Sequence, residues 1–208
     1  MSMTLDFSDL ALYAAAVLIL FLTPGPVWLA MLARAMSGGF KAAWPLALGV
    51  AFGDAIWPVI AILGVSWVAN EIDGIMAILR YVAALVFLVM GVLLVLKVEN
   101  TLGSDSRLTR PGMWAGFIAG VVVILGNPKA ILFYMGVLPG FFDLTEVALL
   151  DLIAIVMVSI TTPLLGNLIL ASFVNKARTF LQSARAVRRI NTMSGMLLMV
   201  VGLVIPFV

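Results

Sequence analysis

Two charged side chains stand near the middle of long apolar segments, where charges are rare. Asp54 lies in the second such segment and Lys129 in the fourth. A charge at the centre of a bilayer costs at least about 2.5–3.5 kcal/mol, so each must face protein or water and have a partner or a proton. We expect a direct or water-mediated Asp54–Lys129 interaction, because pairing lowers the cost of both charges.

The chemistry that such a pair suggests is proton-coupled binding of a charged small molecule. Asp54 is the candidate proton-coupling residue, and Lys129 a candidate substrate-binding residue. Structural roles stay open for both: Asp54 as a carboxylate that satisfies freed backbone groups, and Lys129 as a fixed counter-ion that never meets substrate. Gly49 and Gly53, which precede Asp54, are four residues apart from each other. This spacing places both glycines on one helix face and predicts close helix packing near the site.

Two proline motifs interrupt apolar segments, one in each half of the chain: Thr23-Pro24-Gly25-Pro26 and Gly126-Asn127-Pro128-Lys129. Proline normally stops or kinks a helix, and in lipid the freed backbone groups persist only where protein or water satisfies them. A half-helix that starts after the first motif attracts a carboxylate with its free N–H groups, whereas one that ends there offers carbonyls to an ammonium. The motifs predict a zwitterion site with these substrate-binding residues: Thr23, Pro24, Gly25, Pro26, Asn127, Pro128 and Lys129.

The composition is that of an integral membrane protein. Of 208 residues, 64% are hydrophobic and 11% charged, against about 45–50% and 25% in a soluble domain. The chain has no cysteine and no histidine, which excludes thiolate or imidazole metal sites, and it has no Walker-type phosphate loop. We therefore predict no enzyme activity, no cofactor and no metal. The expected partners are a small amino acid-like substrate, protons and membrane lipids rather than nucleic acid, and a homo-oligomer is left open.

Six segments are long and apolar enough to cross a bilayer, which needs about 20 residues: roughly 9–33, 42–69, 75–96, 112–140, 146–173 and 190–208. The loops after the first, third and fifth segments hold two, three and five Lys or Arg, all of the chain's 12 except Arg80 and Lys129. By the positive-inside rule these loops are cytoplasmic and both termini lie on the non-cytoplasmic side. The basic loop 176–189 is either a short amphipathic helix on anionic headgroups or a topology-setting loop.

The two halves of the chain correspond. Pro24 and Pro58 are separated by 34 residues, and Pro128 and Pro163 by 35. We predict a single all-α transmembrane domain over 1–208, with six helices in two three-helix repeats at about 1–100 and 108–208, and with helices 1 and 4 broken at the proline motifs. Because three is odd, the second repeat is inverted relative to the first.

The chain resembles the LysE/RhtB family of amino acid exporters. The resemblance rests on these segments: Thr23 to Pro26, Ser37-Gly38-Gly39, Gly49 to Asp54, Gly126 to Ala130, Leu138-Pro139, and Asn191 with Gly195 and Gly202. It implies secondary export of amino acids or derivatives across the bacterial inner membrane, driven by proton antiport. In many relatives an asparagine follows Thr-Pro-Gly-Pro, but here the residue is Val27, which favours a more apolar amino acid or another metabolite.

The function that this sequence predicts is export of an amino acid or small zwitterionic metabolite from the cytoplasm by proton antiport. In this mechanism Asp54 alternates between a proton and either Lys129 or the substrate ammonium. One alternative is a passive channel or facilitator in which the same breaks line a pore. A further alternative is a non-transporting membrane scaffold whose glycines serve helix packing.

Overall fold

The computed structural model describes residues 5–71, 75–96, 112–174 and 183–204. Within these ranges the chain is helical and contains no strand, which confirms the predicted all-α class. The helices are α1 (Phe7–Leu22), α2 (Pro26–Glu71), α3 (Ile75–Leu96), α4 (Met113–Leu125), α5 (Pro128–Gly136), the 3₁₀ helix η1 (Leu138–Gly140), α6 (Leu149–Ser172) and α8 (Ala184–Val204).

Both proline motifs break the helices as predicted. α1 ends at Leu22 and α2 begins at Pro26, while α4 ends at Leu125 and α5 begins at Pro128. The second break bends the chain by 56° between α4 and the segment from Pro128 to Gly140. Proline is tolerated where it begins a helix, because the first N–H groups have no intrahelical partner. Asn127 then caps α5, since its Oδ1 accepts the Lys129 N–H at 3.1 Å.

A sharp turn divides the 46 residues of α2 into two helices. Gly38 and Gly39 have non-helical backbone angles, and Gly39 has φ +68°, a left-handed conformation that favours glycine. The Ser37-Gly38-Gly39 segment, one of those that carry the family resemblance, thus forms the turn between these two helices. Arg34, counted above as a loop charge, is instead only 2% exposed. Its guanidinium donates to the carbonyls of Ala42 at 2.8 Å and Gly112 at 2.6 Å, which ties the turn to the start of α4.

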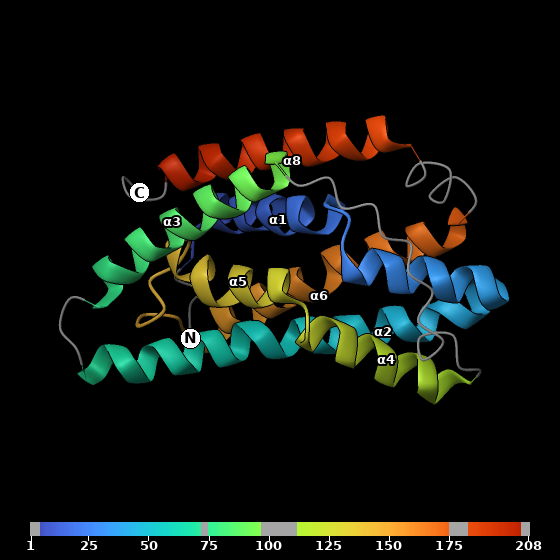
Figure 1. Ribbon diagram of the computed structural model, residues 1–208. Helices are drawn as coiled ribbons and strands as arrows, with labels where there is room; N and C mark the ends of the chain where they lie inside the picture. Colours follow the sequence, from blue (N-terminus) through green and yellow to red (C-terminus); the bar gives the residue numbers. More distant parts are fainter. Residues whose placement is uncertain (1–4, 72–74, 97–111, 175–182, 205–208) are drawn as a thin grey trace.

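The helices form one bundle in which elements from the two halves of the chain lie against each other (Figure 1). α2 packs along both α4 and α6, α3 packs along α8, and α1 contacts α6. The short helix α5 contacts α1, α2 and α3. The Phe7 end of α1 and the Val204 end of α8 lie at the end of the bundle opposite the Gly38–Gly39 turn (Figure 1).

Glycines let α2 and α4 approach until their backbones touch. A Cβ added to Gly49 would collide with the carbonyl oxygen of Phe117, and one added to Gly120 with the carbonyl oxygen of Leu46. Gly53 likewise leaves no room beside the side chain of Ile124. These glycines hold the helix that carries Asp54 against the helix that leads into the second break.

Replacing Gly49 by alanine should therefore destabilise the protein. The added methyl group meets backbone that cannot move without separating the helices, and such overpacking typically costs about 1–3 kcal/mol. Chemical unfolding in detergent micelles measures the effect. Gly64→Ala is the matched control, because that helical glycine has open space around its Cβ position. Equal stability of the two variants would contradict the close packing described here.

The described residues contain two helices with the length and composition of membrane spans, Pro26–Gly64 and Leu149–Ser172, and a third if the bent pair α4–α5 counts as one. The predicted set of six spans is not established by these helices. One reason is that the first proline motif leaves α1 with 16 residues. At 1.5 Å per residue such a helix is about 24 Å long, less than the roughly 30 Å of a bilayer core.

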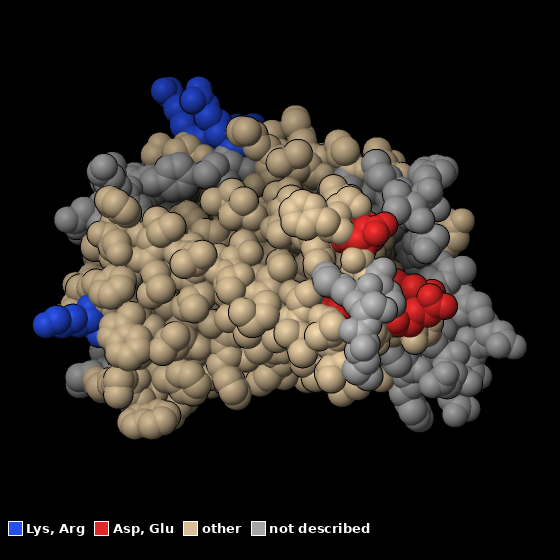
Figure 2. Space-filling model, turned by 180° about the vertical axis from the view of Figure 1, so that it is seen from behind, with Lys and Arg blue, Asp and Glu red and all other residues tan. Residues whose placement is uncertain are grey.

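The surface is apolar over a broad face between charged ends. Figure 2 shows basic residues gathered at one end of the molecule, acidic residues at the other, and no charge on the described surface between them. Many large hydrophobic side chains are exposed among the described residues, for example Leu85, Ile118 and Leu165, whereas soluble proteins rarely expose large contiguous apolar patches. This distribution suits a protein surrounded by lipid along its length.

The predicted basic loop over residues 176–189 is wrong in part. α8 begins at Ala184, so Arg185, Arg188 and Arg189 lie in its first turns and not in a separate loop. The physical reason is that Val187, on the other side of these turns, is 2% exposed, which gives the segment a face that packs. Residues 176–182 of this segment lie outside the described residues.

Candidate functional site

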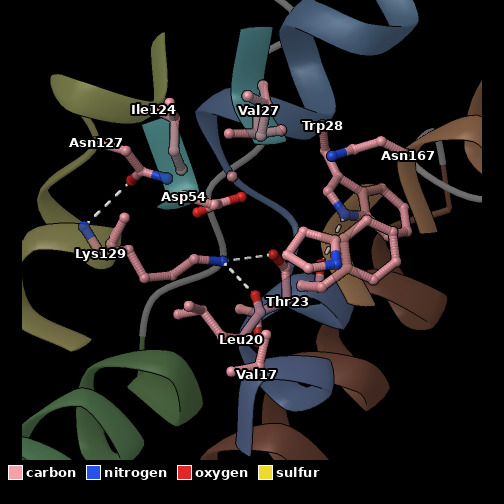
Figure 3. A pocket seen from close by; sticks show the side chains of 15 residues that line it. Val17, Leu20, Thr23, Val27, Trp28, Asp54, Ile124, Asn127, Lys129 and Asn167 are labelled. Atoms are coloured by element: carbon pink, nitrogen blue, oxygen red, sulfur yellow. Dashed lines mark hydrogen bonds between the residues drawn. The ribbon is translucent and has the colours of Figure 1, made fainter. Parts of the chain in front are cut away.

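The two helix breaks meet around a small cavity inside the bundle (Figure 3). Its volume is about 40 Å³, room for about three water molecules. The lining comes from α1, the first break, both parts of α2, the end of α4, the second break, the start of α5 and α6: Val17, Leu20, Phe21, Thr23, Gly25, Val27, Trp28, Val50, Asp54, Ile124, Asn127, Lys129, Ala130, Pro163 and Asn167. Segments more than 100 residues apart thus contribute to one site.

The structure brings most of the predicted site residues into this lining. Thr23, Gly25, Asn127, Lys129 and Asp54 all border the cavity. The three prolines Pro24, Pro26 and Pro128 do not line it, and Pro26 and Pro128 are exposed. They shape the site indirectly by ending or starting the helices. Gly49 and Gly53 lie behind the site, at the contact between α2 and α4.

Lys129 joins the two breaks. Its Nζ donates to the carbonyl oxygens of Leu20 at 2.9 Å and Thr23 at 2.6 Å, which belong to the C-terminal end of α1 and the residue after it. The last carbonyls of a helix lack intrahelical donors and carry the negative end of the dipole, so they attract a cation. The sequence predicted that these carbonyls would attract an ammonium, and here that ammonium belongs to Lys129.

Another carbonyl at this helix end also has a donor from the protein. The indole N–H of Trp28 donates to the Phe21 carbonyl at 2.7 Å, and both side chains line the cavity. The hydroxyl and backbone N–H of Thr23 are both bonded to Ile19. A substrate ammonium would therefore have to find its acceptors elsewhere in the lining.

Asp54 offers one such acceptor. The side chain is 3% exposed, and its Oδ1 accepts the Tyr134 hydroxyl at 3.3 Å, whereas its Oδ2 is buried without a hydrogen-bond partner. Asp54 and Lys129 face the same cavity (Figure 3), but their described contacts include no ion pair between them. The predicted direct Asp54–Lys129 ion pair is absent because the Lys129 ammonium is held by the carbonyls of α1. A water-mediated interaction between the two side chains stays a prediction.

The first turn of α2 supplies the opposite polarity. Val27 and Trp28 line the cavity at the N-terminal end of this helix, where the positive end of the helix dipole favours an anion. Val27 is 9% exposed, so the position at which many LysE/RhtB proteins carry asparagine presents a methyl surface to the cavity here.

Sequence reasoning missed several buried polar residues of α6 and their partners. Asn167 lines the cavity and is fully buried, as is Ser159, which is hydrogen-bonded to the Tyr13 hydroxyl at 2.6 Å. One signal was available: Asp151, Ser159 and Asn167 are polar residues in an otherwise apolar segment, where such side chains are expected to face protein or water rather than lipid. Asp151 accepts the backbone N–H groups of Ala148 and Leu5 at the start of α6.

The lining thus combines a cation, a carboxylate and two amides with apolar walls. Such a set can hold a small molecule that carries both charges and an apolar portion. The described residues contain no cluster of three or more metal-ligating side chains. The cavity has room for about three water molecules, and an amino acid such as leucine has several times as many heavy atoms. Binding therefore requires side chains or helices to move apart.

An apolar helical bundle with a charged internal cavity at two broken helices is the architecture of a membrane transporter. Comparison with known proteins agrees: the chain belongs to the LysE type translocator family, whose model matches residues 18–206. An uncharacterized membrane protein of Synechocystis is 30% identical over 201 residues, 96% of each chain. The leucine efflux proteins of Salmonella choleraesuis and Salmonella typhimurium are 31% identical over 133 residues, 64% of this chain and 63% of theirs. No solved structure matches the chain.

Proposed function

We propose that this protein exports an amino acid with an apolar side chain, leucine being the first candidate, from the bacterial cytoplasm by proton antiport. The observation that carries the proposal is the cavity in which Asp54 and Lys129 present opposite charges within apolar walls. Once the cavity widens, an apolar side chain would lie beside Leu20, Val27 and Ile124, and the ends of the broken helices suit the charged groups. Similarity to leucine efflux proteins supports the choice of substrate.

Asp54 is the proposed proton carrier. A buried carboxylate with one unsatisfied oxygen is costly in its charged form, so it favours either a proton or a cationic ligand. In the proposed cycle Asp54 releases its proton when the substrate ammonium binds, and takes a proton from outside after the substrate has left. Tyr134 holds the carboxylate in place from α5 throughout.

The architecture that we propose for alternating access is two inverted repeats of three helices in the inner membrane. Its support is the packing of α2 against α6 and of α3 against α8, since each pair joins elements at corresponding positions of the two halves. We propose that the end of the bundle with exposed Lys41, Arg185, Arg188 and Arg189 is cytoplasmic and that both termini are outside. The exposed acids Asp6, Asp143 and Glu146 suit the opposite side.

Purified protein in liposomes tests the function. Vesicles start with equal leucine concentrations inside and outside, and acidification of the external medium imposes an inward proton gradient. An antiporter should lower the internal leucine concentration below the external one, and collapse of the gradient with a protonophore should abolish this difference. A passive channel leaves the concentrations equal, and that result would refute the proposal.

A further inference from the structure

A buried amide without hydrogen-bond partners faces the cavity from α6. Asn167 is 0% exposed, and both its Nδ2 and its Oδ1 lack a partner. A primary amide carries two donors and an acceptor oxygen, and buried polar groups in proteins are normally satisfied. Two unsatisfied polar atoms on one buried side chain therefore need an explanation. A ligand that hydrogen-bonds to them when it occupies the cavity supplies that explanation.

The position of this amide points to the same ligand as Asp54. Figure 3 shows Asn167 reaching toward Val27 and Trp28 from the side of the cavity opposite Asn127 and Lys129, with Asp54 between the two sides. Asp54 Oδ2 is the other unpartnered oxygen in this lining. The carbonyls at the end of α1 are occupied by Lys129 and Trp28. The hydrogen-bonding groups of the lining that have no partner thus include an acceptor on Asp54 and a donor and an acceptor on Asn167.

We propose that Asn167 is a substrate-binding residue that recognises the α-ammonium and α-carboxylate of the amino acid together. An amide carries its oxygen and its nitrogen on one carbon, and an α-amino acid carries its two charged groups on neighbouring atoms of the α-carbon. Asn167 Oδ1 then accepts from the ammonium, which also binds Asp54 Oδ2, while Asn167 Nδ2 donates to the carboxylate. This inference rests on the proposed export of an amino acid and adds a determinant that selects a zwitterion over a simple amine or acid.

The variant that tests this proposal is Asn167→Leu, which keeps the approximate size of the side chain and removes both hydrogen-bonding groups. Leucine export in the liposome assay should show a KM raised by about tenfold or more, because hydrogen bonds to charged groups are lost. Asn191→Leu is the matched control, since Asn191 is a buried amide of α8 with an unpartnered Oδ1 that does not line the cavity. Its KM should be that of the wild type.

Two leucine analogues separate recognition from a general structural effect. Isoamylamine lacks the carboxylate and 4-methylpentanoate lacks the ammonium, so each is expected to inhibit wild-type leucine export only weakly. In Asn167→Leu their inhibition constants should change far less than the KM for leucine. If leucine and both analogues weaken equally, or if the KM is unchanged because Asn167 contacts only water, the proposal is overturned.

Thermal unfolding gives a readout that does not need transport. At a leucine concentration near the wild-type KM, leucine should raise the Tm of the wild type and of Asn191→Leu in detergent, and that of Asn167→Leu far less. Without ligand, the Tm of Asn167→Leu should match or exceed that of the wild type. Asn167→Ala provides the same comparison if the leucine variant does not fold. A wild type that neither transports nor binds leucine refutes the proposed function, whereas a normal ligand-induced shift in both Asn167 variants refutes this inference alone.

Discussion

Replacing Asp54 by asparagine should eliminate proton-driven leucine export. Asparagine keeps the shape of the side chain and its contact with Tyr134, but it cannot take up and release a proton. An inward proton gradient should then move no more leucine out of liposomes that contain the variant than out of liposomes without protein. The measurement is internal leucine after external acidification, with the potential clamped by potassium and valinomycin.

The control for this prediction is Asp143→Asn, which neutralises an exposed acid that does not line the cavity. It should export leucine as the wild type does. Exchange of labelled for unlabelled leucine without a gradient further tests the Asp54 variant, because exchange needs binding and conformational change but no net proton movement. Gradient-driven export by Asp54→Asn at the wild-type rate would eliminate Asp54 as the proton carrier.

Replacing Lys129 by methionine should weaken both the fold and transport. Methionine matches the length of the lysine stem but cannot donate to the Leu20 and Thr23 carbonyls, which would be left without their donor. Each hydrogen bond to a charged group contributes about 1.5–3 kcal/mol, so we expect the free energy of unfolding to fall by about 3 kcal/mol. Chemical unfolding in micelles measures this loss, and the liposome assay should show that leucine export is lost with it.

Lys41→Met is the matched control, because Lys41 is exposed beside the Gly38–Gly39 turn. Its removal should leave the free energy of unfolding within about 0.5 kcal/mol of the wild-type value. If Lys129→Met were as stable as Lys41→Met, the contact between the two helix breaks would contribute nothing to the fold. The hydrogen bonds from Lys129 to the Leu20 and Thr23 carbonyls would then make no measurable contribution to the free energy of unfolding.

Local rules were sufficient to predict the helix breaks. Proline at Pro26 and Pro128 and glycine at Gly39 act on the backbone within a few residues, so the breaks and the turn can be read directly from the sequence. The apolar composition likewise indicates a membrane protein by itself. The LysE family resemblance follows from the same motifs and is confirmed by the match to residues 18–206.

The partners of the charged residues could not be predicted in this way. Lys129 bonds carbonyls more than 100 residues earlier in the chain, and Asp54 bonds the hydroxyl of Tyr134 rather than the ammonium. An ammonium is satisfied equally well by carbonyls or by a carboxylate, so residue type alone does not decide between them. The choice depends on which helix end lies within reach, and packing sets that distance.

The sequence by itself determined the helical membrane class, the position of both breaks and the residues that bring charge to them, because these follow from composition and from backbone sterics. Only the tertiary structure decided that Lys129 occupies the carbonyls at the end of α1, that Arg34 is buried, and that Asn167 reaches the cavity from α6. The physical reason is that hydrogen-bond satisfaction in a nonpolar interior is a property of the whole packed bundle. The Lys129 ammonium and the Arg34 guanidinium donate to the carbonyls that close helix packing places beside them, wherever those carbonyls lie in the chain.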